Sequence, residues 1–144
     1  MKGMQEVVVD ASVIVKWFVE EESSDKAIIV RDKYIDGEIK LIAPEILPFE
    51  VLNALYYKKL FSKEELEEIS EALEEFSFEL YSLKGEYAKK IIEVVVKNGI
   101  TVYDASYIGL AVFKNTQVYT SDKKLIGRLN KEFLGYVKDI DYLI

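Results

Sequence analysis

Short apolar runs alternate along the chain with longer stretches in which apolar residues recur every three or four positions. Short runs rich in valine and isoleucine are typical of buried strands, and the longer period is typical of helices that cover a core. The pattern predicts strands at residues 7–9, 40–42, 78–81, 117–120 and 136–138. It predicts helices at residues 12–18, 23–34, 44–60, 63–76, 84–97, 103–113 and 122–130.

Local start and stop signals mark several of these boundaries. Ser62 and Glu65 have the spacing of a capping box at the start of the fourth helix. Gly37 breaks the second helix, and Asn98-Gly99 closes the fifth. Pro44 is expected to open the third helix, because proline is favoured at the first helical position.

The order of these elements predicts the fold class. Strands separated by helices indicate crossover connections, and therefore an α/β fold with a mainly parallel sheet flanked by helices on both faces. No internal repeat, linker or low-complexity segment divides the chain, so residues 1–144 are expected to form a single domain. At this length, a chain whose residues are 50% hydrophobic can bury a real core.

Composition excludes several kinds of chemistry. The sequence has no cysteine, which removes disulfides, thiolate zinc sites and cysteine nucleophiles. It has no histidine either, which removes imidazole as a general base, as a metal ligand and as the middle member of a hydrolytic triad. Hydrolytic chemistry would have to come from carboxylates, hydroxyls, lysines or a bound metal ion.

Charge and hydropathy bear on location and partners. The N-terminal residues lack the apolar stretch of a signal peptide, and no apolar run approaches the length of a membrane span, so a cytoplasmic protein is expected. The net charge of −7 argues against a simple basic surface for holding nucleic acid. It leaves a nucleic-acid enzyme open, because some of the acidic residues could be ligands for cations.

Two acidic residues follow predicted strands, where sites form in open parallel sheets. Asp10 comes directly after residues 7–9, and Asp122 follows the strand that ends at Thr120. Each has an alternative as a turn or helix-capping carboxylate, which is common at such junctions. Ser12 could likewise be a ligand for water or metal, or only the N-cap of its helix.

Two further acids lie on helices that carry apolar stripes. Glu50 shares a face with Leu47 and Val51, where a carboxylate is costly to bury unless a cation meets it. Asp104 stands at the start of its predicted helix, on the same helical face as the apolar Ile108. For Glu50 the alternatives are an acid at the stripe's edge that pairs with a lysine, or one that extends to water. For Asp104 the alternative is a first-turn acid in a capping box. Together the four carboxylates form an oxygen-rich set of the kind that Mg²⁺ or Mn²⁺ binds.

Four segments in this order resemble the PIN-domain ribonucleases, and most of all the toxin subunits of VapBC-type toxin–antitoxin pairs. They are VVVDASVIVKWF at residues 7–18, APEILPFEVLNAL at 43–55, TVYDASYIGLA at 101–111 and YTSDKKL at 119–125. The resemblance implies a three-layer fold with a mainly parallel five-stranded sheet. It also implies a metal-binding acidic cluster, with a hydroxyl at the position of Ser12. The residues of that cluster are Asp10, Glu50, Asp104 and Asp122.

The function implied is a Mg²⁺- or Mn²⁺-dependent ribonuclease that hydrolyses RNA phosphodiester bonds. The resemblance further implies a toxin that forms a homodimer and is inhibited by a cognate antitoxin protein. A PIN-type RNA-maturation nuclease and a catalytically idle PIN-like binding domain remain alternatives. A phosphoaspartyl signalling module would require an acidic pair after the first strand, but the residue next to Asp10 is Ala11.

Basic and aromatic residues near the acidic segments are candidates for binding RNA or a partner. The basic candidates are Lys16, Lys58, Lys59, Lys123, Lys124 and Arg128, although each could be an ordinary solvated side chain. Trp17-Phe18 and the segment 56–61 combine aromatic residues with charge, as protein interfaces do. The alternative for these aromatics is that they only close the core.

Overall fold

The β-branched runs pair into one sheet in the computed structural model, which describes residues 4–143. The sheet has five strands in the order β3-β2-β1-β4-β5, and every neighbouring pair is parallel. The strands are β1 (Gln5–Val9), β2 (Ile39–Pro44), β3 (Glu79–Tyr81), β4 (Val118–Thr120) and β5 (Val137–Asp139). The predicted α/β class is confirmed, and all five carboxyl ends meet at one edge because all strands run the same way.

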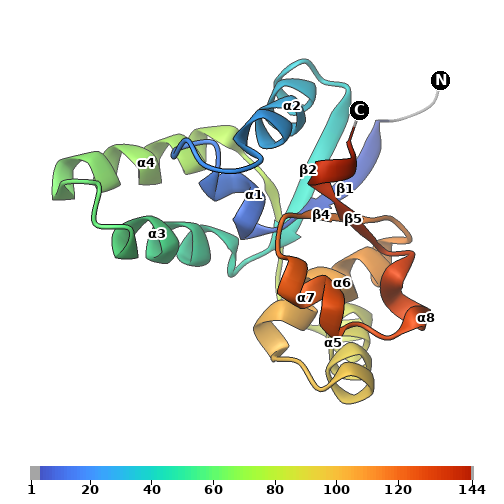
Figure 1. The fold of residues 1–144 in the computed structure, drawn as a ribbon. Coiled ribbons are helices and arrows are strands. Elements are labelled where there is room, and N and C mark those ends of the chain that lie inside the picture. The colour runs from blue at the N-terminus through green and yellow to red at the C-terminus, as the bar shows by residue number, and fades with distance from the viewer. Residues whose placement is uncertain (1–3, 144) are drawn as a thin grey trace.

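Helices cover both faces of this sheet and form the outer layers. Figure 1 shows α1 and α2 on one side of the sheet and α5 and α6 on the other, while α3 and α4 reach out together from the sheet as an arm. The helices are α1 (Ala11–Val15), α2 (Ser24–Ile35), α3 (Leu47–Tyr57), α4 (Lys63–Phe76), α5 (Gly85–Asn98), α6 (Val102–Lys114), α7 (Lys123–Arg128) and α8 (Lys131–Leu134). A 3₁₀ turn, η1 (Ile140–Tyr142), follows β5.

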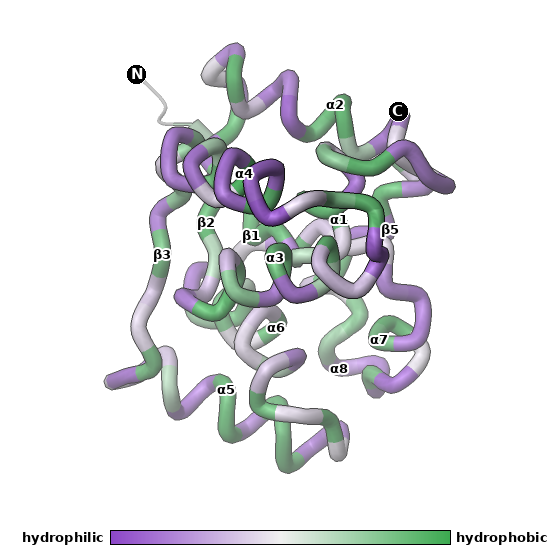
Figure 2. The backbone as a smooth tube through the Cα atoms, turned by 90° about the vertical axis from the view of Figure 1, so that its left-hand side faces the viewer, coloured by the Kyte–Doolittle hydropathy of each residue, from purple (hydrophilic) through white to green (hydrophobic). Residues whose placement is uncertain are grey.

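The core lies between β1, β2 and the central helix α6. The last three residues of β1 are inaccessible to solvent, and so are most residues in the middle of α6. Gly109 lets α6 approach α5 closely, since a Cβ there would lie 2.9 Å from Cγ1 of Ile91 and 3.0 Å from its backbone. In contrast, α4 is mostly hydrophilic along its length (Figure 2), as its exposed position predicts.

Several predicted boundaries are confirmed and others are wrong. The Ser62–Glu65 capping box forms, and Gly99 ends α5 with a positive φ of 66°. Pro44 does not open a helix: it is the last residue of β2 and pairs with Tyr81, and α3 begins three residues later with Pro48 in its first turn. A proline fits a strand end as well as a helix start, because its missing N–H is needed at neither place.

Other differences lie near the chain's two ends. The first helix stops at Val15 and continues as turns, so it is shorter than predicted. The short helix α8 was not predicted, because four residues are too few to show a helical period. None of the helices in the described part of the chain has both the length and the apolar character that crossing a membrane requires.

Candidate active site

Asp10 lies at the carboxyl end of the central strand, where β1 passes into α1. Only 8% of it is exposed, and its Oδ2 accepts hydrogen bonds of 2.7 Å from both Ser12 Oγ and Thr120 Oγ1. Asp10 occupies the N-cap position of α1, but its side chain makes no capping hydrogen bond. The capping alternative for its carboxylate is therefore wrong, since two hydroxyls hold it instead.

The two hydroxyls that hold Asp10 are themselves oriented by backbone amides. Ser12 Oγ accepts from the Ser121 N–H at 3.0 Å, and Thr120 Oγ1 accepts from the Asp122 N–H at 3.0 Å. With these amides as donors, each hydroxyl proton is free to point at Asp10. Ser12 is thus not an N-cap residue. Thr120 was missed by the sequence analysis, because a threonine in a strand is explained by strand propensity alone.

Glu50 lies in the first turn of α3, with its side chain half-buried. Its Oε1 accepts a 2.5 Å hydrogen bond from the hydroxyl of Tyr107 on α6. Glu50 takes part in none of the ion pairs of residues 4–143, so the lysine-paired alternative is wrong. Burial raises the pKa of the Glu50 carboxyl, the Tyr107 hydrogen bond opposes this shift, and the charges of Asp10 and Asp104 add to it.

Asp104 and Asp122 complete the set of predicted acids. The backbone N–H of Asp104 donates to Thr101 Oγ1 at 3.0 Å, so Thr101 caps α6. Asp122 Oδ1 accepts from the Leu125 N–H at 3.0 Å, which confirms that Asp122 caps α7. Burial raises the pKa of Asp104, the negative charge of Asp122 adds to the shift, and the positive charge of Arg128 opposes it.

Electrostatic interactions connect these four carboxylates. Burial raises the pKa of Asp10, its two hydroxyl hydrogen bonds oppose the shift, and the charges of Asp122 and Asp104 add to it. None of the four acids belongs to an ion pair within the described residues. The sheet edge therefore concentrates negative charge that the protein itself does not neutralise.

The donor set fits a hard divalent cation in its chemistry, because carboxylate and hydroxyl oxygens are what Mg²⁺ and Mn²⁺ bind. Among residues 4–143, however, no three acidic side chains lie close enough together to hold a metal ion. Asp10, Glu50 and Asp122 each have one oxygen engaged in a hydrogen bond, and like charges repel one another when no cation is bound.

Ion pairs occupy several of the basic candidates. Lys16 and Lys58 both bond Glu21, at 3.2 and 2.9 Å. Lys123 forms ion pairs with Asp139, the last residue of β5, at 2.8 Å and with Asp141 in η1 at 2.6 Å. In the described part of the chain, Lys124 and Arg128 form no ion pair, and Lys59 lies over the ring of Tyr56. Lys16, Lys123 and Lys124 line a hollow of about 360 Å³ beside Asp122.

The aromatic candidates have two different outcomes. Trp17 packs against Phe76 and Phe78, and its Nε1 donates to the Ala27 carbonyl at 2.8 Å, so it closes the core. Phe18 is also packed against the core, so the core-closing alternative describes this pair. The segment 56–61 remains exposed, with half of Tyr56 accessible to solvent.

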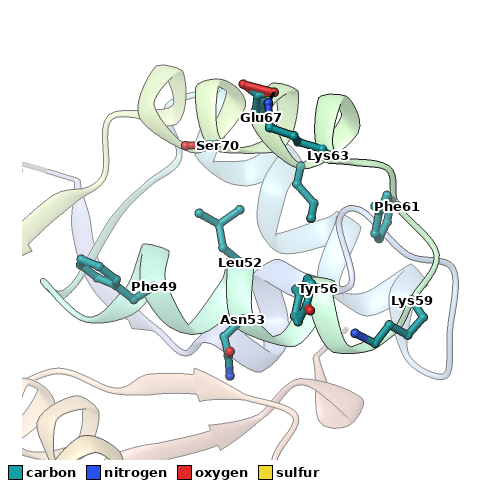
Figure 3. A pocket seen from close by; sticks show the side chains of 10 residues that line it. Phe49, Leu52, Asn53, Tyr56, Lys59, Phe61, Lys63, Glu67 and Ser70 are labelled. Atoms are coloured by element: carbon teal, nitrogen blue, oxygen red, sulfur yellow. Dashed lines mark hydrogen bonds and ion pairs between the residues drawn. The ribbon is translucent and has the colours of Figure 1, made fainter.

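A groove of about 810 Å³ separates α3 from α4 (Figure 3). Leu52 points from α3 toward α4, and Phe61 lies at the end near the loop that joins the two helices. Tyr56 lines the groove from α3. Lys63 and Glu67 on α4 supply charged side chains along the opposite wall. The groove is thus apolar at its base and charged at one rim.

Comparisons with known proteins agree with this architecture. The family model described as the PIN domain matches residues 7–131. Ribonuclease VapC3 of Pyrobaculum aerophilum is 31% identical over 124 residues, which cover 83% of this chain and 91% of that protein. The crystal structure of PAE2754 from Pyrobaculum aerophilum is similar with a TM-score of 0.58 and 23% identity, over 96% of this chain and 92% of that one.

Two solved structures from bacteria share the fold at lower identity. The crystal structure of FitAcB from Neisseria gonorrhoeae has a TM-score of 0.69 and 14% identity, over 95% of this chain and 99% of the other. A toxin–antitoxin complex from Klebsiella pneumoniae has a TM-score of 0.68 and 13% identity, over 96% of this chain and 99% of the other. At such low sequence identities, these two structural similarities show the fold alone.

Proposed function

Because the chain belongs to the PIN domain family, we propose that it is a metal-dependent ribonuclease that hydrolyses RNA phosphodiester bonds. The observation that carries the proposal is the environment of Asp10. This carboxylate is held at the sheet edge by two hydroxyls, and no cation of residues 4–143 pairs with it. Burial raises its pKa, and the negative charges of Asp122 and Asp104 add to the shift. A buried, uncompensated acidic cluster is costly for stability, and binding a cation removes that cost.

The residues that would hold the ion are Asp10, Glu50, Asp104 and Asp122, with Ser12 as a hydroxyl that orients Asp10. A bound Mg²⁺ or Mn²⁺ ion would supply an activated water and neutralise charge on the phosphate. Ser12 and Thr120 fix one oxygen of Asp10, so that its other oxygen faces away from them. Such an ion would also neutralise the repulsion between the four carboxylates.

The absence of histidine favours a particular outcome of cleavage. A cyclic-phosphate route through paired imidazoles is closed to this chain. In direct hydrolysis, the water oxygen forms a bond to phosphorus, the bond to the ribose 3′ oxygen breaks, and a proton passes to that leaving oxygen. The products are then a 5′-phosphate and a 3′-hydroxyl end.

The test is incubation of 5′-labelled structured RNA with the protein in Mg²⁺, in Mn²⁺ and in excess chelator, followed by analysis of the cut ends. The proposal expects cleavage only with metal, and fragments with 5′-phosphate ends that a ligase can join. Undiminished cleavage in chelator would disprove the metal requirement. Cyclic-phosphate ends would disprove direct hydrolysis.

We further propose that the chain is the toxin of a toxin–antitoxin pair, acts in the cytoplasm and forms a homodimer. Similarity to Ribonuclease VapC3 and the shared fold with toxin–antitoxin proteins support this role. The groove between α3 and α4 suits an amphipathic segment of the antitoxin, since it combines an apolar base with one charged rim. A basic side chain of that partner could also pair with Asp10 and Asp104.

A further inference from the structure

The buried hydroxyl of Tyr107 links the elements that carry the acidic cluster. We propose that Tyr107 is a positioning residue for divalent-metal binding, which holds one oxygen of Glu50 so that the other is presented to the ion. The inference rests on the proposed metal-dependent function and adds to it a residue outside the predicted acidic set.

Packing alone does not account for this hydroxyl. Tyr107 lies on α6 and is only 1% exposed, so a phenylalanine would fill the same space. Its hydroxyl donates to Glu50 Oε1 at 2.5 Å. This hydrogen bond joins α6, the helix that also carries Asp104, to an acid on α3.

The bond also determines which part of Glu50 is available. Tyr107 is the one hydrogen-bond partner of this carboxylate among the described residues, and it engages Oε1. Oε2 is therefore left for an ion. A half-buried carboxylate without this donor would gain by turning toward water, because an unsatisfied charged group is costly to bury. The hydroxyl thus keeps Glu50 directed at the cluster, as partners of metal ligands commonly do.

The direct test is Tyr107→Phe, which keeps the ring and removes the hydroxyl. Mn²⁺ affinity, measured by titration calorimetry and by electron paramagnetic resonance of free Mn²⁺, should fall by about 10- to 100-fold. The Mn²⁺ concentration that gives half-maximal RNA cleavage should rise by the same factor. Circular dichroism should show an intact fold.

Tyr87→Phe is the matched control. Tyr87 is also buried, but its hydroxyl donates to the Ser106 backbone carbonyl at 2.8 Å, outside the cluster. This variant should bind Mn²⁺ as the parent does. A double-mutant cycle adds specificity: in a Glu50→Ala background, Tyr107→Phe should change Mn²⁺ affinity by less than about twofold, because its partner is gone.

A measurement on the parent protein avoids any loss of folding in the variant. With ring-labelled tyrosine, addition of Mg²⁺ should shift the nuclear magnetic resonance signals of Tyr107 and leave those of Tyr87 in place. An unchanged Tyr107 signal, or parental Mn²⁺ affinity in Tyr107→Phe, would overturn the inference alone. Equal losses in Tyr107→Phe and Tyr87→Phe would do the same. A parent that binds no divalent metal would instead overturn the proposed function, and this inference with it.

Discussion

Thr120 Oγ1 donates a 2.7 Å hydrogen bond to Asp10 Oδ2, although the two residues stand 110 positions apart in the chain. The bond joins the carboxyl ends of β4 and β1, which are neighbours in the sheet. Thr120 also accepts from the Asp122 backbone N–H, so a single hydroxyl connects two of the four acids. The pairing of β1 with β4 therefore fixes the relative positions of Asp10 and Asp122.

Thr120→Val should impair both stability and cleavage. The substitution keeps the shape, leaves the Asp122 N–H without a partner and removes one of the two hydroxyls that donate to Asp10 Oδ2, a cost of roughly 1–3 kcal/mol in the free energy of unfolding. Urea denaturation measures this loss. Thr116→Val is the control, since Thr116 bonds the Glu6 carbonyl away from the cluster. It should lose stability but retain the parent's cleavage rate per folded molecule, and an equal loss of cleavage would contradict the account.

Asp104→Asn should stabilise the metal-free protein at neutral pH. The pKa of Asp104 is raised in the folded state, so folding becomes less favourable as pH rises from the ordinary carboxyl pKa toward the raised one. Above that window the penalty is constant, and below it both states are protonated and the penalty vanishes. The variant should gain roughly 0.5–1 kcal/mol at pH 7, a typical scale for partly exposed charges, and nothing near pH 3.

Urea unfolding in chelator at several pH values measures this difference between Asp104→Asn and the parent. Saturating Mg²⁺ should reverse the order of stability, because the ion stabilises only the parent's intact cluster. A variant that is less stable than the parent at pH 7 in chelator would contradict the claim that burial and the charge of Asp122 make the ionised Asp104 unfavourable.

The sequence predicted much of the fold because its signals are local. Buried valine runs identified β1, and a complete capping box identified the start of α4 at Ser62. Strand-end placement pointed to Asp10 as a candidate site residue, which stays a prediction. Thr120 and Tyr107 were not identified, because a strand threonine and an aromatic on an apolar helix face are explained equally well by propensity and packing. Their hydrogen bonds depend on contacts between distant segments, which one sequence does not reveal.

Gly109→Ala should destabilise the packing of α5 against α6. The added Cβ would lie 2.9 Å from Ile91 Cγ1 and 3.0 Å from backbone atoms, and backbone cannot move aside as a side-chain end can. Overpacking of this kind costs roughly 1–3 kcal/mol. Gly127→Ala, in α7, is the control: its Cβ would meet nothing within 4 Å, so stability should be unchanged or rise by up to about 1 kcal/mol. Thermal unfolding of both variants tests the pair, and equal stabilities would contradict the close approach.

The groove between α3 and α4 should be required for inhibition but not for cleavage. Phe49→Ala with Tyr56→Ala removes two exposed aromatic side chains from its lining. The double variant should cleave RNA like the parent, yet fail to copurify with, or be inhibited by, the product of the adjacent small gene. Tyr142→Ala removes an aromatic that is 72% exposed elsewhere and should leave the complex intact. If the antitoxin inhibits the double variant as it does the parent, it binds another surface of the protein.

The most direct measurement of the central claim is the RNA cleavage rate of Asp10→Asn beside the parent in saturating Mg²⁺ or Mn²⁺. Asp25→Asn, which changes an acid in the first turn of α2 away from the cluster, is the matched control. The account predicts that Asp10→Asn retains its fold and loses at least about 100-fold in rate, in keeping with several kcal/mol of metal-dependent stabilisation of the transition state. Asp25→Asn should cleave like the parent. A folded Asp10→Asn protein that cleaves RNA at the parental rate would contradict the assignment of the acidic cluster as the active site.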